Sequence, residues 1–152
     1  MDISAKTDYA IRALLAIADE QAEGPVSVET LVRHQGLPRK FLEAILGDLR
    51  RGGLVTSQRG PTGGYTLARP ANEIAVGDVF RIVDGPLAEV RGLRPNETEY
   101  VGAAKHLPVL WVAVRASLRT VLDGTSIADL LSGSLPTQVA TLAAGPDAWK
   151  SR

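Results

Sequence analysis

Apolar residues recur at helical spacing in several stretches of the chain. The first stretch predicts a helix from about Ser4 to Gln21, capped by Ser4, whose apolar stripe contains Ala10, Ile11, Leu14, Leu15, Ile17 and Ala18. A short helix over 28–35 follows, capped by Ser27, and Gly36 supplies a tight turn into a third helix. The apolar face of that third helix contains Phe41, Leu42, Ile45, Leu46 and Leu49. The pattern therefore predicts a helix–turn–helix.

The third helix begins after Leu37-Pro38 and ends at Gly52-Gly53. Its polar face is mostly basic and carries Arg39, Lys40, Glu43, Gly47, Arg50 and Arg51. Two short strands over 54–58 and 65–69 come next, joined by a glycine-rich loop that Arg59 begins. A basic helix before a thin ribbon is typical of a winged helix, in which the helix enters the major groove of DNA and the ribbon approaches the minor groove.

This interpretation gives candidate DNA-binding residues. Lys6 and Thr7 lie in the first turn of the first helix, where the positive dipole end favours a phosphate, although Lys6 could equally be a solvated surface residue. On the third helix the candidates are Arg39, Lys40 and Glu43, whose side chains suit guanine and cytosine edges; the alternative for Lys40 and Glu43 is a surface ion pair. In the loop the candidates are Arg59, as a minor-groove side chain, with Gly60, Gly63 and Gly64, which permit positive φ and close approach to the DNA backbone.

The second half of the chain predicts an arm. A short amphipathic helix over 76–84 leads into an irregular connector over 85–106. A long helix over 107–123 then shows a four–three apolar spacing, typical of a seam between two helices, at Leu107, Trp111, Val114, Leu118 and Val121. We expect this helix to be a dimer interface; the alternative is a core helix of a monomer. A last helix over 127–131 could fold over the partner, and Trp149 in the remaining tail is expected to be incidental.

The predicted fold class is therefore mainly α, a winged helix-turn-helix with a two-stranded wing and a long C-terminal dimerisation helix. We divide the chain into a DNA-binding domain (1–72), a short helix and connector (73–106), the dimerisation and terminal helices (107–132) and a flexible tail (133–152).

Charge and composition sharpen this picture. The formal net charge is zero, but residues 33–69 hold seven Lys or Arg against two Asp or Glu, a local balance of +5. The absence of cysteine excludes disulfides and thiolate metal sites, and we expect no cofactor and no metal. Two histidines without a matched nucleophile argue against an enzyme. No signal peptide or apolar run of membrane-spanning length is visible, so we expect a cytoplasmic protein without a membrane partner.

Three segments carry a resemblance to a known family: YAIRALLAIA (9–18), the run from 24 to 70, and IAVGDVFRIVDGPL (74–87). They resemble the bacterial winged-helix regulators that include the iron–sulfur cluster regulator IscR, the nitric-oxide sensor NsrR and the cysteine-metabolism repressor CymR, over about residues 1–132. The resemblance implies a very short strand at 25–27 and a base-reading role for Glu43. In cluster-binding relatives the connector carries three cysteines and a fourth ligand, whereas Gly92, Thr98 and Ala104 stand near the cysteine positions here, so cluster sensing is not carried over. The remaining polar residues there, Glu97, Glu99 and His106, form no convincing cluster or zinc set.

We therefore predict a homodimeric regulator, a repressor, that binds double-stranded DNA at a pseudo-palindromic operator. The alternative is a winged helix that serves as a protein-interaction module without direct DNA binding. Three forms of control stay open: a small molecule in a cleft lined by Tyr100, His106 and Trp111, a protein partner as the resemblance to CymR suggests, or no effector.

Overall fold

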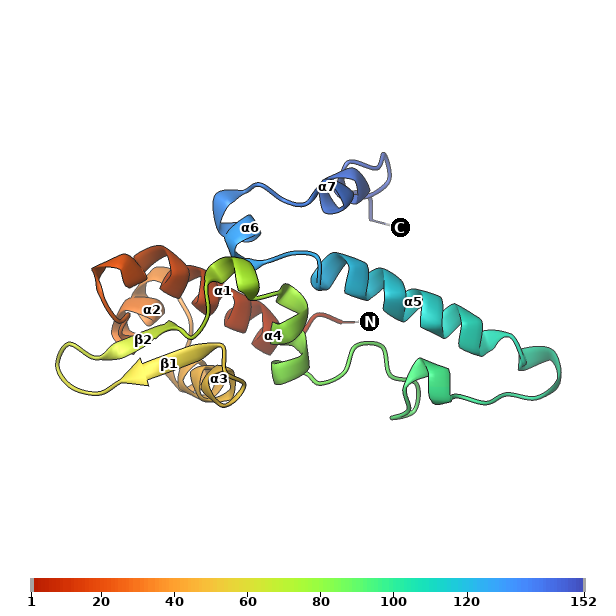
Figure 1. Ribbon diagram of the computed structural model, residues 1–152, viewed down its shortest axis with the longest axis horizontal. Helices are drawn as coiled ribbons and strands as arrows, with labels where there is room; N and C mark the ends of the chain where they lie inside the picture. The colour runs from red at the N-terminus through yellow and green to blue at the C-terminus, as the bar shows by residue number, and fades with distance from the viewer. Residues whose placement is uncertain (1, 152) are drawn as a thin grey trace.

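The computed structural model describes residues 2–151 as a helical body with a two-stranded hairpin at one end and a helical arm at the other (Figure 1). The α-helices and strands in chain order are α1 (Ala5–Glu20), α2 (Val28–Gln35), α3 (Arg39–Arg51), β1 (Val55–Gln58), β2 (Gly64–Leu67), α4 (Val76–Val83), α5 (Leu107–Leu122), α6 (Ile127–Ser132) and α7 (Thr137–Ala143). Single 3-10 turns lie at Gln21–Glu23, Ala71–Glu73, Pro95–Glu97 and Gly102–Ala104. In the part of the chain described, no helix has the length and apolarity needed to cross a membrane.

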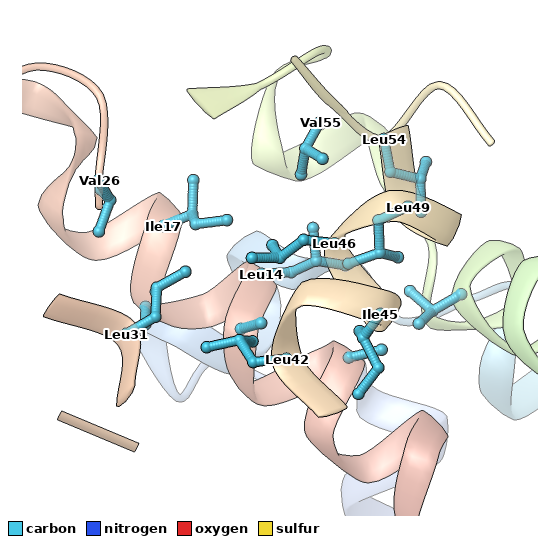
Figure 2. Packing of buried hydrophobic residues seen from close by; sticks show 14 of the residues in the cluster. Leu14, Ile17, Val26, Leu31, Leu42, Ile45, Leu46, Leu49, Leu54 and Val55 are labelled. Atoms are coloured by element: carbon cyan, nitrogen blue, oxygen red, sulfur yellow. The ribbon is translucent and has the colours of Figure 1, made fainter. Parts of the chain in front are cut away.

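The core lies where α1, α2 and α3 pack together beneath the hairpin (Figure 2). The predicted N-caps are confirmed, since Ser4 Oγ accepts from the Thr7 amide at 3.0 Å and Ser27 Oγ from the Thr30 amide at 3.2 Å. Gly36 ends α2 in the left-handed conformation at φ 62°, as a tight turn requires. The largest fully buried side chains include Leu14, Ile17, Leu31, Leu42, Ile45, Leu46 and Leu49.

α3 has the predicted bounds but a narrower apolar stripe than expected. Leu42, Ile45, Leu46 and Leu49 are at most 1% exposed, whereas Phe41 is 59% exposed. The prediction that Phe41 is buried is wrong, because the four leucine and isoleucine positions already fill the side of the helix that faces α1 and α2. Phe41 lies at the edge of that stripe and projects into solvent.

The hairpin β1–β2 is antiparallel, with Val55 opposite Leu67 and Gln58 opposite Gly64. The short third strand implied by the resemblance is confirmed as a single bridge: Val26 and Tyr65 exchange amide-to-carbonyl hydrogen bonds of 2.8 and 2.9 Å. This bridge holds β2, near the loop end of the hairpin, against the segment before α2, so the loop 59–63 projects from an anchored ribbon.

α5 projects away from the body, and the connector that precedes it runs beside it (Figure 1). None of its residues is buried by the described part of the chain. α6, by contrast, packs against α1: Ile127 is fully buried in the core of its own chain and donates its amide to Ile74 O at 2.9 Å. Ile127 of α6 thus completes this chain's own core, and a contact between α6 and a partner stays a prediction.

Residues 137–143 form a helix, α7, where a flexible tail was predicted. Pro136 sits at its N-cap, and the Trp149 indole Nε1 donates to Ala143 O at 2.7 Å. The side chain thus satisfies one of the carbonyls that a helix C-terminus leaves without an internal partner. Trp149 is 87% exposed, but it is a capping residue of α7 and so more than incidental.

Candidate nucleic-acid interface

The outer face of α3 presents the predicted polar side chains to solvent. Lys40 and Glu43 are both exposed, and they do not pair with each other. Lys40 has no ion-pair or hydrogen-bond partner among residues 2–151, which leaves its ammonium group available to a phosphate or a base edge. The hydrophobic stripe on the other side of α3 holds the helix in place, so the orientation of this face is set by core packing.

Arg39 is held by two carboxylates. Its guanidinium contacts Glu29 of α2, and its Nε donates to Glu43 Oε1 at 3.1 Å. The hydrogen bonds that Arg39 donates, first to Glu29 and then to Glu43, raise the pKa of Arg39 above its ordinary value. The pKa of Glu29 lies below its ordinary value, first because of a backbone hydrogen bond and then because of Arg39. Arg39 therefore lies on the predicted face, but in this structure its charge is engaged by the protein itself.

The structure separates the two candidates at the start of α1. Lys6 is partly exposed and its Nζ lies 2.6 Å from Asp48 of α3, which lowers the pKa of that carboxyl below its ordinary value. Thr7 is fully buried, and its hydroxyl donates to Asp84 Oδ2 at 2.7 Å. Ser4 Oγ also donates to Asp84, at 2.7 Å, so this carboxylate occupies the positive end of α1. The Thr7 hydroxyl is therefore engaged within the chain, and its contact with DNA stays a prediction.

The backbone at the wing requires glycine at three positions, for two different reasons. Gly60 has φ 110°, which favours glycine. At Gly63 the reason is close approach: a Cβ would lie 2.2 Å from Gln58 O, and one at Gly64 would lie 2.4 Å from Val26 O. Gly63 does not have the positive φ that the sequence suggested. Arg59 at the start of this loop is exposed and has no partner in the described chain.

One candidate was missed. Phe41 lies next to Lys40 on α3 and exposes a large aromatic ring beside the polar face. Apolar side chains at such positions can contact the methyl group of thymine. The sequence could have indicated this, because residues 42, 45, 46 and 49 alone make a complete buried stripe on α3. Phe41 is an additional apolar residue that this stripe does not need.

The predicted seam of α5 lies along an apolar groove. Val114, Leu118 and Val121 line a cavity of about 750 Å³ together with Ile3, Phe80 and Leu87, among other residues. Leu107 and Trp111 do not line it, although both are partly exposed on the same helix. Further apolar side chains of α5, Val109 and Leu110 above all, are exposed.

The predicted effector cleft of Tyr100, His106 and Trp111 does not coincide with either large cavity beside α5. Tyr100 stacks under the guanidinium of Arg91, 5.4 Å from its ring centre, and His106 is exposed just before α5. Trp111 is partly buried, and its indole N–H is shielded from solvent without an acceptor among residues 2–151. None of the three lines either of the two large cavities beside α5.

The family is decided by a sequence model that matches residues 3–133 and is described as Rrf2, an iron-dependent transcriptional regulator. The chain belongs to the Rrf2 family. The HTH-type transcriptional regulator Rv1287 of Mycobacterium tuberculosis H37Rv is 46% identical to this chain over 143 residues. These residues are 94% of this chain and 89% of that protein. The HTH-type transcriptional regulator CymR of Bacillus subtilis is 35% identical over 132 residues, 87% of this chain and 91% of CymR.

Solved structures agree with this assignment. The structure of CymR, the global cysteine regulator of B. subtilis, has a TM-score of 0.74 at 33% identity and covers 88% of this chain and 98% of its own. A transcriptional regulator structure from Listeria innocua has a TM-score of 0.76 at 31% identity and covers 100% of this chain and 96% of its own. The winged-helix fold class is thus confirmed, and this Rrf2-family protein is a DNA-binding transcriptional regulator. Its named relatives are transcriptional regulators rather than enzymes.

The residues of this Rrf2-family regulator do not fit the iron group in the family description. The sequence contains no cysteine, so no thiolate can ligate a cluster. Across residues 2–151, no three His, Asp or Glu side chains converge as a metal site. Iron therefore has no part in the function proposed for this protein.

Proposed function

We propose that this regulator acts as a homodimeric repressor that places two copies of α3 and the wing on a pseudo-palindromic operator. The supporting observation is α5, an apolar helix of which no residue is buried by residues 2–151. A helix that is apolar on most sides is stable in water only when a partner covers it. A second copy of the chain is the partner that also supplies the second DNA-binding unit.

The groove beside α5 suits this second copy. Val114, Leu118 and Val121 form a continuous apolar strip with the N-terminal Ile3 and with Phe80 of α4. The seam spacing, which repeats every three and four residues, matches a like helix packed at a shallow angle. Two DNA-binding units held in this way would address successive major grooves, one helical turn or about 34 Å apart.

On each half-site, α3 supplies the base contacts and the wing supplies the minor-groove contact. Lys40 can donate to guanine and Glu43 can accept from cytosine, while Phe41 suits a thymine methyl group. Arg59 enters a narrow, A/T-rich minor groove at the flank, and the amides near Gly60, Gly63 and Gly64 lie against the backbone. Lys6 and Arg39 contact phosphates once they leave Asp48, Glu29 and Glu43.

The regulator acts in the cytoplasm without a membrane partner, and it represses by occupying the operator. Deletion of its gene would then raise transcription from the promoter that carries the operator, and a fall in transcription would show an activator instead. CymR, a relative, is named a global cysteine regulator. The cleft over Tyr100, His106 and Trp111 is not part of this proposal, because none of the three residues lines either large cavity beside α5.

The experiment is a fluorescence-anisotropy titration of an operator duplex at several salt concentrations. Arg59→Ala should weaken binding and abolish the preference for A/T-rich over G/C-rich flanks. Lys40→Ala should weaken binding, with a salt slope about one unit smaller if it contacts a phosphate. The matched control is Arg91→Ala, because Arg91 is also an exposed arginine but lies on the connector, stacked on Tyr100. Equal affinity of Arg59→Ala and wild type at physiological salt would show that the wing does not bind DNA.

A further inference from the structure

A second, polar cavity of about 690 Å³ lies on the side of α5 next to the apolar groove. It is formed by α4, by the connector and by α5, and its volume is that of a small-molecule site, about 300–1,000 Å³. Four arginines line it: Arg81 from α4, Arg94 from the connector, and Arg115 and Arg119 from α5.

Two of these arginines are neutralised by the protein. Arg81 Nη2 makes a two-pronged ion pair with Asp123, at 2.6 and 2.7 Å, and Arg119 Nε lies 3.3 Å from the same carboxylate. The guanidinium groups of Arg94 and Arg115 have no partner within the described residues. Arg115 is nevertheless only partly exposed. The four arginines share the lining with Asp78, Glu89 and Asp123, which leaves the cavity with one positive charge in excess.

The wall that carries Arg94 is anchored. The Arg94 amide donates to Glu97 Oε2 at 3.1 Å, and the neighbouring Pro95 and Thr98 are buried, with Thr98 Oγ1 donating to Pro95 O at 2.7 Å. Arg94 and Asn96 therefore start from a fixed turn, although their side chains face solvent. Two guanidinium groups that line one cavity suit the planar oxygens of a carboxylate or the oxygens of a phosphate.

Glu89 of the connector also lines the cavity, and it has no partner in the part of the chain described. Its carboxylate disfavours a second negative charge and can accept a hydrogen bond from a hydroxyl or ammonium group. One turn of α5 before Arg115, the buried indole N–H of Trp111 lacks an acceptor. Unsatisfied buried donors are uncommon in native proteins, and this one lies on the row of α5 side chains that leads to the cavity.

From these observations we propose that the cavity is an effector site for a small organic anion, a carboxylate or a phosphate ester that also carries a hydrogen-bond donor. Arg94 and Arg115 hold its anionic group, and Glu89 accepts from its donor. The bound anion joins the connector to α5. Since α5 is the proposed dimer arm, binding changes the position of the two α3 helices; this last consequence alone rests on the proposed function.

The test uses the full chain with Trp149→Phe, so that Trp111 is the only fluorescent tryptophan. Inorganic phosphate and lactate, which has a hydroxyl donor, are titrated at constant ionic strength set with sodium chloride. Saturable changes in Trp111 emission are expected with at least one probe. Arg94→Gln and Arg115→Gln should each weaken this binding about tenfold or more. Glu89→Gln should strengthen phosphate binding, an effect opposite in sign that loss of folding could not produce.

The matched control is Arg91→Gln, which removes a connector arginine that does not line the cavity, and it should bind the probes as wild type does. The proposal is overturned if neither probe saturates, or if the Arg115 and Arg91 variants bind equally. It is also overturned if Arg115→Gln shifts the oligomeric state, because the cavity would then belong to a contact between copies. If the wild-type protein does not bind the operator, the proposed function is contradicted, whereas the proposed anion site is unaffected.

Discussion

At the scale of single residues, some of the charged side chains on the predicted DNA-binding face are already paired within the protein. Arg39 is bound by Glu29 and Glu43, whereas Lys40 and Arg59 lack partners in the described chain. A carboxylate that binds Arg39 competes with a phosphate for the same guanidinium group. We therefore predict that Glu29→Gln raises affinity for DNA of any sequence and steepens its dependence on salt, because one more cation is free. Glu99→Gln, the same charge change on the connector, is the control for anisotropy measurements on a non-operator duplex; equal affinity of the two variants would contradict the competition.

The Lys6–Asp48 pair joins α1 to α3 and gives a pH-dependent contribution to stability. Because the hydrogen bond from Lys6 lowers the pKa of Asp48 in the folded protein below its ordinary value of 3.8, the stabilisation is complete above that value and is lost as the pH falls below it. Asp48→Asn should therefore lower the free energy of unfolding at pH 7 by at most about 1 kcal/mol, since the pair is partly exposed. Urea unfolding at pH 7 and pH 3 should show this difference shrinking toward acid pH. A constant or growing difference would mean that Asp48 acts through something other than its charge.

At the scale of elements, neighbouring residues of α3 have opposite roles. Leu42 is 1% exposed and Phe41 is 59% exposed. Leu42→Ala should lower the free energy of unfolding by about 2–5 kcal/mol, as buried leucine truncations do. Phe41→Ala should change it by no more than about 1 kcal/mol and should weaken operator binding instead. Chemical unfolding and operator titration of both variants measure this split, and a large loss of stability for Phe41→Ala would place its ring in the core.

Most of the fold could be predicted from short stretches of the sequence. The caps Ser4 and Ser27, the turn at Gly36 and the ends of α3 follow from backbone chemistry within a few residues, and the structure agrees with them. The features that the sequence did not reveal depended on contacts distant in the chain. Thr7 is buried because Asp84, 77 positions later, binds the start of α1. α7 was not predicted because its sequence is rich in small residues. Its C-terminus is capped by Trp149, which lies six positions after Ala143 in the sequence. The two cavities beside α5 needed the connector to fold back, which no local pattern reveals.

At the scale of the whole molecule, α5 is an apolar helix whose side chains the described part of the chain leaves unburied. Val114 lines the apolar groove and Val109, 72% exposed, does not. Val114→Glu should convert the proposed dimer to a monomer, because an unpaired charge would be buried in the seam. Val109→Glu introduces the same charge away from the groove and should leave the dimer intact. Sedimentation velocity gives the masses, and a dimer that survives Val114→Glu but not Val109→Glu would place the interface on the other face of α5.

The most direct measurement is a footprint of the purified protein on its own promoter at several salt concentrations, with Arg59→Ala beside the wild type. The account predicts protection of an inverted repeat whose half-sites lie about one helical turn apart. It also predicts a logarithm of the binding constant that falls steeply with the logarithm of salt, and loss of protection at the flanks in Arg59→Ala. Absent protection, or weak binding that neither salt nor Arg59→Ala alters, would contradict DNA recognition by α3 and the wing and would indicate a protein-interaction module.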